Sequence, residues 1–376
     1  MINGHGGNIN KLCNAYGLNP DEVIDFSASI NPLGYPNSVR KVILERFDDI
    51  LNYPDSECTN LRKAIAEKHS CNESNIIVGN GSNELFYLIP RALKPKQGII
   101  LQPTFSEFKD ALLNANTDVI EIINDINKEL SFDLNNTRLR SFKEGIVFLC
   151  NPNNPTGQLI KKNKILKLAK DDSKRLIVVD EAFMDFVEDA EKYSVIKEAH
   201  LMRNLIVVRS LTKFYGFPGL RLGYLIACET ITKKILPFKE PWTVNALAQV
   251  AGQVAVNDKE FAFNTKKFIS VEKVFLYEGL TKIDGLHPFY PSANFILVRI
   301  DNDGIKSSRI HDLLIKDKIA IRDCSNFVGL NDRYFRVAAR TREENQRLLS
   351  ALKLATDYRI SEGTSRRGFA QEFVAG

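Results

Sequence analysis

Short apolar runs alternate with amphipathic segments along the first two thirds of this chain. The runs are rich in Ile, Val and Leu and span residues 76–79, 98–102, 117–122, 145–150, 175–180, 205–210 and 222–227. Runs of this length and composition predict buried β-strands, and their alternation with helical patterns predicts a mostly parallel sheet covered on both faces. We therefore expect an α/β fold whose large domain holds a seven-stranded sheet between helices.

The pattern changes in the last third of the chain. Residues 245–285 become helical and charged, and three further apolar runs follow at 293–300, 318–323 and 333–339. They predict a smaller α+β domain, and Thr341 with Glu344 forms a capping box that opens a last helix. The expected divisions are an N-terminal arm over 1–35, a large domain over 36–250, an interdomain helix over 251–285, a small domain over 286–358 and a tail over 359–376.

Composition narrows the classes of function. The chain has 376 residues, of which 44% are hydrophobic, and this is enough for two packed domains. The net charge of +5 is spread without a basic run, which argues against a nucleic-acid partner. No stretch approaches the roughly 18 apolar residues of a membrane span, and the first residues lack the apolar segment of a signal peptide. The 6 cysteines contain no CxxC pair, so we expect a cytoplasmic protein without a zinc site.

Polar residues stand where several of the expected strands end. Gly81 and Ser82 follow the first strand, Asn151 follows the fourth, Asp180 ends the fifth and Lys213 comes after the sixth. In open α/β sheets, ligands bind beyond the carboxyl ends of the strands. We therefore expect these residues to meet in one crevice.

Lys213 and Asp180 have the chemistry of a cofactor site. A desolvated lysine has a depressed pKa, and its neutral amine can form a Schiff base with an aldehyde. A carboxylate such as Asp180 can pair with a cationic ring nitrogen, an attraction worth roughly 4 kcal/mol at about 4 Å and an effective dielectric near 20. That energy corresponds to about three pKa units and would keep a pyridine protonated at neutral pH. The alternative for Asp180 is a helix N-cap.

Further polar groups suit a phosphate and a ring oxygen. The loop Asn-Pro-Asn-Asn-Pro-Thr-Gly (151–157) can present the amide of Asn154 to a ring phenolate. The segment 79–84 opens a helical run, and its backbone N–H groups form a helix N-terminus suited to a phosphate. Ser210 adds a hydroxyl and Arg221 a bidentate guanidinium for the same dianion. An amine, a carboxylate, an amide and a phosphate cradle are together what pyridoxal 5′-phosphate (PLP) requires.

At these motifs the chain resembles the fold-type I PLP enzymes, on the branch of the histidinol-phosphate aminotransferases and the L-threonine-O-3-phosphate decarboxylases. The resemblance covers about residues 3–357 and rests on 151–157, Asp-Glu-Ala-Phe (180–183), Ser-Leu-Thr-Lys (210–213) with Arg221, and Phe-Arg-Val-Ala-Ala-Arg (335–340). It implies that Lys213 carries the cofactor, that Asp180 pairs with the pyridine nitrogen and that Asn154 bonds the ring oxygen. The cofactor-binding residues that it implies are Tyr53, Gly81, Ser82, Asn83, Phe105, Asn154, Asp180, Phe183, Ser210, Thr212, Lys213 and Arg221.

Three aromatic residues carry separate expectations from the resemblance. Phe105 would stack on the cofactor ring, although Phe108 is a rival and either could be core packing. Phe183 stands where transaminases of this branch usually have tyrosine, so the phenol that would bond the ring oxygen is missing. Tyr53 resembles the tyrosine that reaches the cofactor phosphate of the neighbouring subunit, which implies a homodimer with shared sites.

The substrate expectation rests on the ends of the chain. His-Gly-Gly-Asn (5–8) and residues 25–34 resemble the phosphothreonine decarboxylases more than the transaminases. Two late arginines would clamp a substrate phosphate or carboxylate, unless they are exposed strand charges, and the segment 5–8 could instead be a flexible loop. The residues implied in substrate binding are His5, Asn31, Asn154, Arg322 and Arg336.

We therefore expect α-decarboxylation of a small phosphorylated amino acid, O-phospho-L-threonine or O-phospho-L-serine, to a phosphorylated amino alcohol. With phosphothreonine as substrate, the family implies a part in cobalamin biosynthesis, whereas phosphoserine would give ethanolamine phosphate. The alternative is an aminotransferase that acts on a phosphorylated amine or amino acid such as histidinol phosphate.

Overall fold

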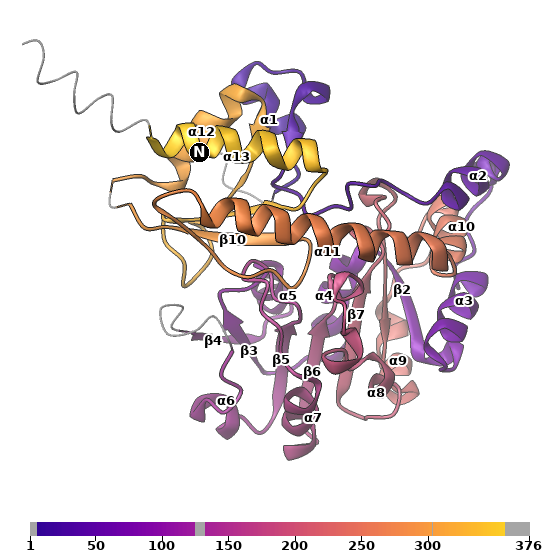
Figure 1. Cartoon of the computed structure of the whole chain (residues 1–376). Helices are drawn as coiled ribbons and strands as arrows, with labels where there is room; N and C mark the ends of the chain where they lie inside the picture. The colour runs from indigo at the N-terminus through magenta and orange to yellow at the C-terminus, as the bar shows by residue number, and fades with distance from the viewer. Residues whose placement is uncertain (1–5, 125–131, 303, 358–376) are drawn as a thin grey trace, which may run out of the picture.

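A seven-stranded sheet forms the centre of the large domain in the computed structural model, which describes residues 6–124, 132–302 and 304–357 (Figure 1). The strand order is β2-β8-β7-β6-β5-β3-β4. The bounds are Ile76–Asn80 for β2, Gln97–Gln102 for β3, Asp118–Ile123 for β4, Gly145–Cys150 for β5, Arg175–Asp180 for β6, Leu205–Ser210 for β7 and Leu222–Ile226 for β8. The predicted strands and the predicted α/β class are confirmed.

Strand direction places the polar residues at one edge of this sheet. The pairs β3–β4, β3–β5, β5–β6 and β6–β7 are parallel, so these strands end at the same edge. In contrast, β8 runs antiparallel to both β2 and β7 and therefore begins at that edge. Arg221, directly before β8, consequently reaches the same edge as Asp180 and Ser210.

Helices cover both faces of the sheet because neighbouring strand residues point in opposite directions. Val147 and Leu149 belong to one core, and Ile146 and Phe148 belong to the other. The first core is closed by α3 (Thr59–His69), α7 (Lys162–Asp171), α8 (Ile196–Ala199) and α10 (Ala246–Ala255), with α2 (Asn37–Glu45) against α10 and α6 (Thr137–Ser141) nearby. The second core is closed by α4 (Gly81–Leu93), α5 (Glu107–Asn114) and α9 (Glu229–Ile235).

The small domain is built on an antiparallel sheet of order β12-β13-β10-β9. Its strands are β9 (Leu286–Pro288), β10 (Phe295–Ile300), β12 (Arg322–Asp323) and β13 (Tyr334–Ala338), and its helices are α1 (Ile9–Tyr16), α12 (Ser307–Leu314) and α13 (Arg342–Asp357). The long helix α11 (Lys259–Thr281) runs along the boundary between the two sheets (Figure 1). The predicted capping box is confirmed, because the backbone N–H of Thr341 and that of Glu344 each donate to the other residue's side chain.

One strand prediction was wrong in its extent. Residues 318–323 form two short strands: β11 (Ile319–Ala320) pairs in parallel with β1 (Ile24–Asp25), whereas β12 pairs with β13. Ile319 and Ile321 both enter the core of the small domain, so the apolar pattern continues while the pairing partner changes between them. The new pairing brings the segment after β1 next to β13, where Ala338 N–H donates to the carbonyl of Phe26.

The domain limits given above stay predictions, and the tail expected over 359–376 lies outside the described residues. Among the helices in the described parts of the chain, none combines the length and the apolar character needed to cross a membrane.

Candidate active site

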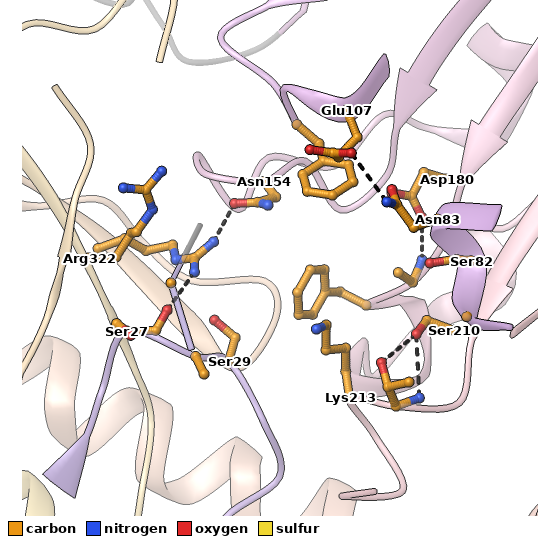
Figure 2. Close-up of a pocket in the computed structure, with 18 of the residues that line it drawn as sticks. Ser27, Ser29, Ser82, Asn83, Glu107, Asn154, Asp180, Ser210, Lys213 and Arg322 are labelled. Carbon is orange, nitrogen blue, oxygen red and sulfur yellow. Dashed lines mark hydrogen bonds between the residues drawn. The ribbon is translucent and has the colours of Figure 1, made fainter. Parts of the chain in front are cut away.

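A cavity of about 290 Å³ opens at the carboxyl edge of β5, β6 and β7, where the small domain faces the large sheet (Figure 2). Its walls include every cofactor-binding residue expected from the sequence except Tyr53, together with Arg322 and Arg336. Residues from both domains therefore meet in one site. His5 lies outside the described residues, and Asn31 is not part of the wall.

Lys213 projects into this cavity from the turn that follows β7. Burial of the amine lowers its pKa from 10.5 to about 8, and the positive charges of Arg221 and Arg336 act in the same direction, whereas Asp180 opposes them. A substantial neutral fraction is therefore present near physiological pH, as an amine that attacks an aldehyde requires.

Asp180 ends β6 and faces the same cavity. Burial raises the pKa of this carboxyl to about 7, although Ala182 N–H donates to Oδ1 at 2.9 Å and the thiol of Cys150 lies 3.8 Å from Oδ2. The bond to Ala182 closes a local turn. This turn is the extent of the capping by Asp180, for which a helix N-cap was the alternative role. A cationic group in the cavity would stabilise the ionised form that burial disfavours.

Arg336 couples the small domain to the loop after β5. Its Nη1 donates to Asn154 Oδ1, and its Nη2 donates to the carbonyl of Ser27 at 2.9 Å. This contact occupies the amide oxygen of Asn154 and leaves the amide N–H groups for the cavity (Figure 2). Burial lowers the pKa of Arg336 to about 10.

Arg322 lies directly opposite Arg336 in the β12–β13 pair, and both side chains line the cavity. Arg322 donates to the carbonyl of Asp323 at 2.6 Å and to Asn326 Oδ1 at 2.9 Å, and its guanidinium stacks over the ring of Phe327 at 5.2 Å. Burial lowers the pKa of Arg322. Two buried guanidinium groups on neighbouring strands suit an anion.

A second group of residues suited to an anion lies at the start of α4. Gly81 has φ +80°, and a Cβ there would stand 2.6 Å from Arg221 Nη2, so only glycine allows the guanidinium to approach the helix N-terminus. The wall also includes Ser82, and the hydroxyls of Ser210 and Thr212 lie 2.7 Å apart. A helix N-terminus, hydroxyl groups and a guanidinium together suit a phosphate.

A buried ion network holds the strand ends from the side opposite the cavity. Arg209 donates from Nε to Glu181 at 3.0 Å and from Nη1 to Asp185 at 2.8 Å. Glu181 directly follows Asp180, and Arg209 directly precedes Ser210. Because neighbouring residues of extended backbone point to opposite sides, the network fixes the two strand ends without entering the cavity.

Several wall residues were not predicted from the sequence: Gly6, Ser27, Ala28, Ser29, Glu107, Ala182 and Phe327. Glu107 accepts hydrogen bonds from Asn83 at 3.2 Å and from Tyr87 at 2.9 Å. The hydroxyl of Ser29 is buried and has no partner among the described residues. Ser29 lies within residues 25–34, and Glu107 lies between Phe105 and Phe108, so the sequence indicated these parts of the chain but not which of their side chains point inward.

The aromatic residues named from the sequence lie in different places. Phe105 lines the cavity, whereas Phe108 stacks on Phe148 within the core at 4.9 Å. Phe183 also lines the cavity and packs edge-on against Phe295 at 4.9 Å. Tyr53 is 83% exposed and contacts Trp242 at a ring distance of 5.0 Å, away from the cavity of its own chain.

Comparisons with known proteins agree with this geometry. Residues 21–352 match the model of the family "Aminotransferase class I and II". The chain is 36% identical over 355 residues to the threonine-phosphate decarboxylase of Salmonella typhimurium, with 93% of this chain and 95% of that protein covered. It is also 36% identical to the adenosylcobalamin biosynthesis bifunctional protein CobDQ of Leptospira interrogans, of which it spans 40% while 92% of this chain is covered. The crystal structure of the histidinol-phosphate aminotransferase from Clostridium acetobutylicum is similar with a TM-score of 0.82 and 31% identity, over 88% of this chain and 99% of that chain.

Proposed function

The chain belongs to the class I and II aminotransferase family, and on that premise we propose that it is a PLP-dependent decarboxylase of O-phospho-L-threonine. The observation that carries the proposal is the pair of buried guanidinium groups, Arg322 and Arg336, in one cavity with Lys213 and Asp180. The similarity to a threonine-phosphate decarboxylase over nearly the whole chain supports the same substrate.

The residues of the cavity fit PLP. Asp180, whose pKa burial raises to about 7, would gain a cationic partner in the ring nitrogen, and Lys213, with a pKa near 8, would attach to the aldehyde. The α4 N-terminus, Ser210 and Arg221 would hold the phosphate. When bound, PLP supplies an electron sink that stabilises negative charge at the α-carbon of an amino acid.

The protein's own residues would decide which bond breaks. Arg322 and Arg336 would grip the two anionic groups of the substrate and orient the carboxylate across the ring, because the bond that lies perpendicular to the ring is the one that is weakened. Phe105, Phe183 and Phe327 line the cavity with apolar surface and would limit the access of water. Lys213 Nζ would be released when the amine of the substrate takes its place at the aldehyde. After accepting a proton from that amine, Nζ would deliver it to the carbon that has lost CO2.

The product would be aminopropanol phosphate, and the similarity to an adenosylcobalamin biosynthesis protein supports a part in that pathway. The sequence also allowed O-phospho-L-serine, but the relatives named above lend it no support. All 6 cysteines are free thiols, which suits the proposed cytoplasmic location.

The proposal includes a homodimer with shared sites. Large apolar side chains stand exposed along residues 44–53, where Leu44 is 69%, Leu51 is 79% and Tyr53 is 83% exposed, and Trp242 lies against Tyr53. An apolar surface of this kind is typical of a subunit interface. Tyr53 would then reach the cofactor phosphate of the neighbouring subunit, in line with its absence from the cavity of its own chain.

A second candidate function is transamination of a phosphorylated substrate. It is favoured by the similarity to a histidinol-phosphate aminotransferase structure, and both reactions need the same cofactor residues. The two differ in the fate of the carboxylate and in the need for an amino-group acceptor.

The deciding experiment is an incubation of purified protein and PLP with O-phospho-L-threonine and, separately, with O-phospho-L-serine, without any keto acid. We expect release of CO2 and formation of aminopropanol phosphate from phosphothreonine. Histidinol phosphate with 2-oxoglutarate serves as the comparison. No CO2 from phosphothreonine, together with glutamate formed from 2-oxoglutarate, would establish the aminotransferase instead.

A further inference from the structure

We infer that Asn31 is a positioning residue for Lys213 and holds the turn that carries the amine. The inference rests on the proposed function only in taking Lys213 as the residue that attaches PLP. The backbone N–H of Asn31 donates to the carbonyl of Lys213 at 3.1 Å, and its side-chain Nδ2 donates to the carbonyl of Phe214 at 2.8 Å. Asn31 therefore bonds two successive peptide groups of that turn.

The side-chain amide of Asn31 is fully engaged by the protein. Besides Phe214, Nδ2 donates to Thr265 Oγ1 on α11 at 2.9 Å, and Oδ1 accepts from Leu33 N–H at 3.1 Å. A carbonyl oxygen such as that of Phe214 can only accept, which fixes the orientation of the amide. Asn31 is 3% exposed, so both its N–H donors serve the fold and neither is left for a substrate.

Backbone packing joins the same two segments at a second point. Residues 31–34 form a turn closed by Gly34 N–H to the Asn31 carbonyl, and residues 213–216 form another closed by Gly216 N–H to the Lys213 carbonyl. Gly216 has φ +65°, and a Cβ there would stand 2.0 Å from the carbonyl oxygen of Gly34. The two turns, here called the arm turn (31–34) and the lysine turn (213–216), are thus packed backbone against backbone.

The consequence concerns the amine of Lys213. The charged groups that act on it are Arg221, Arg336 and Asp180, and Asn31 is uncharged, so its removal changes no charge around the amine. Without the amide, the carbonyl of Phe214 loses its donor in a buried place, which loosens the lysine turn. Water would then approach Nζ, and relief of desolvation would raise its pKa.

The test uses Asn31→Ala protein reconstituted with PLP. Two readouts need no substrate: the pH midpoint of the absorbance band of Lys213-bound PLP, and borohydride trapping of PLP at Lys213 followed by mass spectrometry. The midpoint reports the proton on the imine nitrogen that Nζ becomes when PLP is attached. We expect it to rise by about half a pH unit or more, because that nitrogen is less desolvated. We also expect attachment at neutral pH to slow by about tenfold, because the amine is less well aligned with the aldehyde.

Asn204→Ala is the matched control. Asn204 is 6% exposed, and its Nδ2 donates to three backbone carbonyls, those of Ala169, Asp172 and Arg175, at the start of β7 and away from the cavity. Loss of a buried amide should lower Tm in both variants, but only Asn31→Ala should displace the midpoint. A purely structural role of Asn31 would leave the two midpoints the same, and that result would overturn the inference.

Thr265→Val keeps the test decisive if Asn31→Ala does not fold. This change preserves the shape of residue 265 and removes one acceptor of the Asn31 amide, so the midpoint should move in the same direction by a smaller amount. A midpoint equal to that of the wild type would contradict the inference. If wild-type protein itself attaches no PLP at Lys213, the proposed function fails and not the role of Asn31.

Discussion

The carboxyl of Asp180 links the stability of the cofactor-free protein to pH. Its pKa is about 7 in the folded chain because burial disfavours the charged form, whereas an unfolded chain has an Asp pKa of about 3.9. Between about pH 4 and pH 7 the folded state holds a proton that the unfolded state has lost, so stability falls as the pH rises through this window. The loss reaches at most roughly 4 kcal/mol and is complete above the folded pKa.

Asp180→Asn should therefore flatten the pH dependence of the free energy of unfolding in cofactor-free protein. At pH 8 the variant should be the more stable of the two, and near pH 4 it should match the wild type, since an amide carries no charge to desolvate. Thermal melts from pH 4 to pH 8 measure the effect. Added PLP should raise the Tm of the wild type more than that of the variant, and equal pH slopes would contradict this account.

Arg336→Ala should weaken substrate binding by about 2 to 5 kcal/mol, the range for loss of one partner of a buried charge pair. The absorbance band of bound PLP should persist, because the predicted phosphate ligands are untouched. Steady-state kinetics with phosphothreonine provide the measurement. Arg340→Ala is the control, since its guanidinium binds the carbonyl of Asp25 and the carboxylate of Glu344 and does not line the cavity. An unchanged KM for Arg336→Ala would show that Arg336 does not bind the substrate.

At this scale the sequence predicted residue identities better than side-chain directions. Lys213, Asp180 and Arg221 stand at strand ends, where topology alone brings them together. Asn31 was expected to bind substrate but turns toward the lysine turn, and Ser29, two positions earlier, faces the cavity. The direction of Asn31 is set by its bonds to Phe214 and Thr265, which are distant in the chain, and local patterns do not encode such contacts.

At the scale of elements, apolar runs located all seven strands of the large sheet. The direction of β8 and the division of residues 318–323 were not predicted, because both depend on which distant strand becomes the partner. Strand existence is a local property of composition, whereas strand pairing is a property of the whole chain.

The start of α4 offers a test of the proposed phosphate cradle. Gly81→Ala places a Cβ 2.6 Å from Arg221 Nη2 at a backbone φ of +80°, so it should displace the guanidinium and weaken PLP binding by about tenfold, as a strain of about 1 to 2 kcal/mol implies. Equilibrium titration of PLP gives the Kd. Gly219→Ala is the control in the same region, because a Cβ there meets nothing within 4 Å. Equal affinities of the two variants for PLP would show that the N-terminus of α4 does not bind the cofactor phosphate.

At the scale of the whole molecule, the proposed dimer places residues of two chains in each site. A mixture of Tyr53→Ala and Lys213→Ala subunits, unfolded and refolded together, should form heterodimers with one complete site each. Random pairing predicts about a quarter of the wild-type activity, although each variant alone should have little. The decarboxylation assay on the mixture measures this, with mass from light scattering as the check on assembly. Activity no greater than that of the separate variants would show that Tyr53 serves its own chain only.

The Arg209 network has a consequence for the heat capacity change of PLP binding. Glu181 and Arg209 are anchored to each other directly beside Asp180 and Ser210, so the order of these strand ends is established when the chain folds. A receptor that is already preorganised loses little conformational entropy on binding. The heat capacity change of PLP uptake should therefore reflect only the surface that the ligand covers, with no contribution from folding of the site around it.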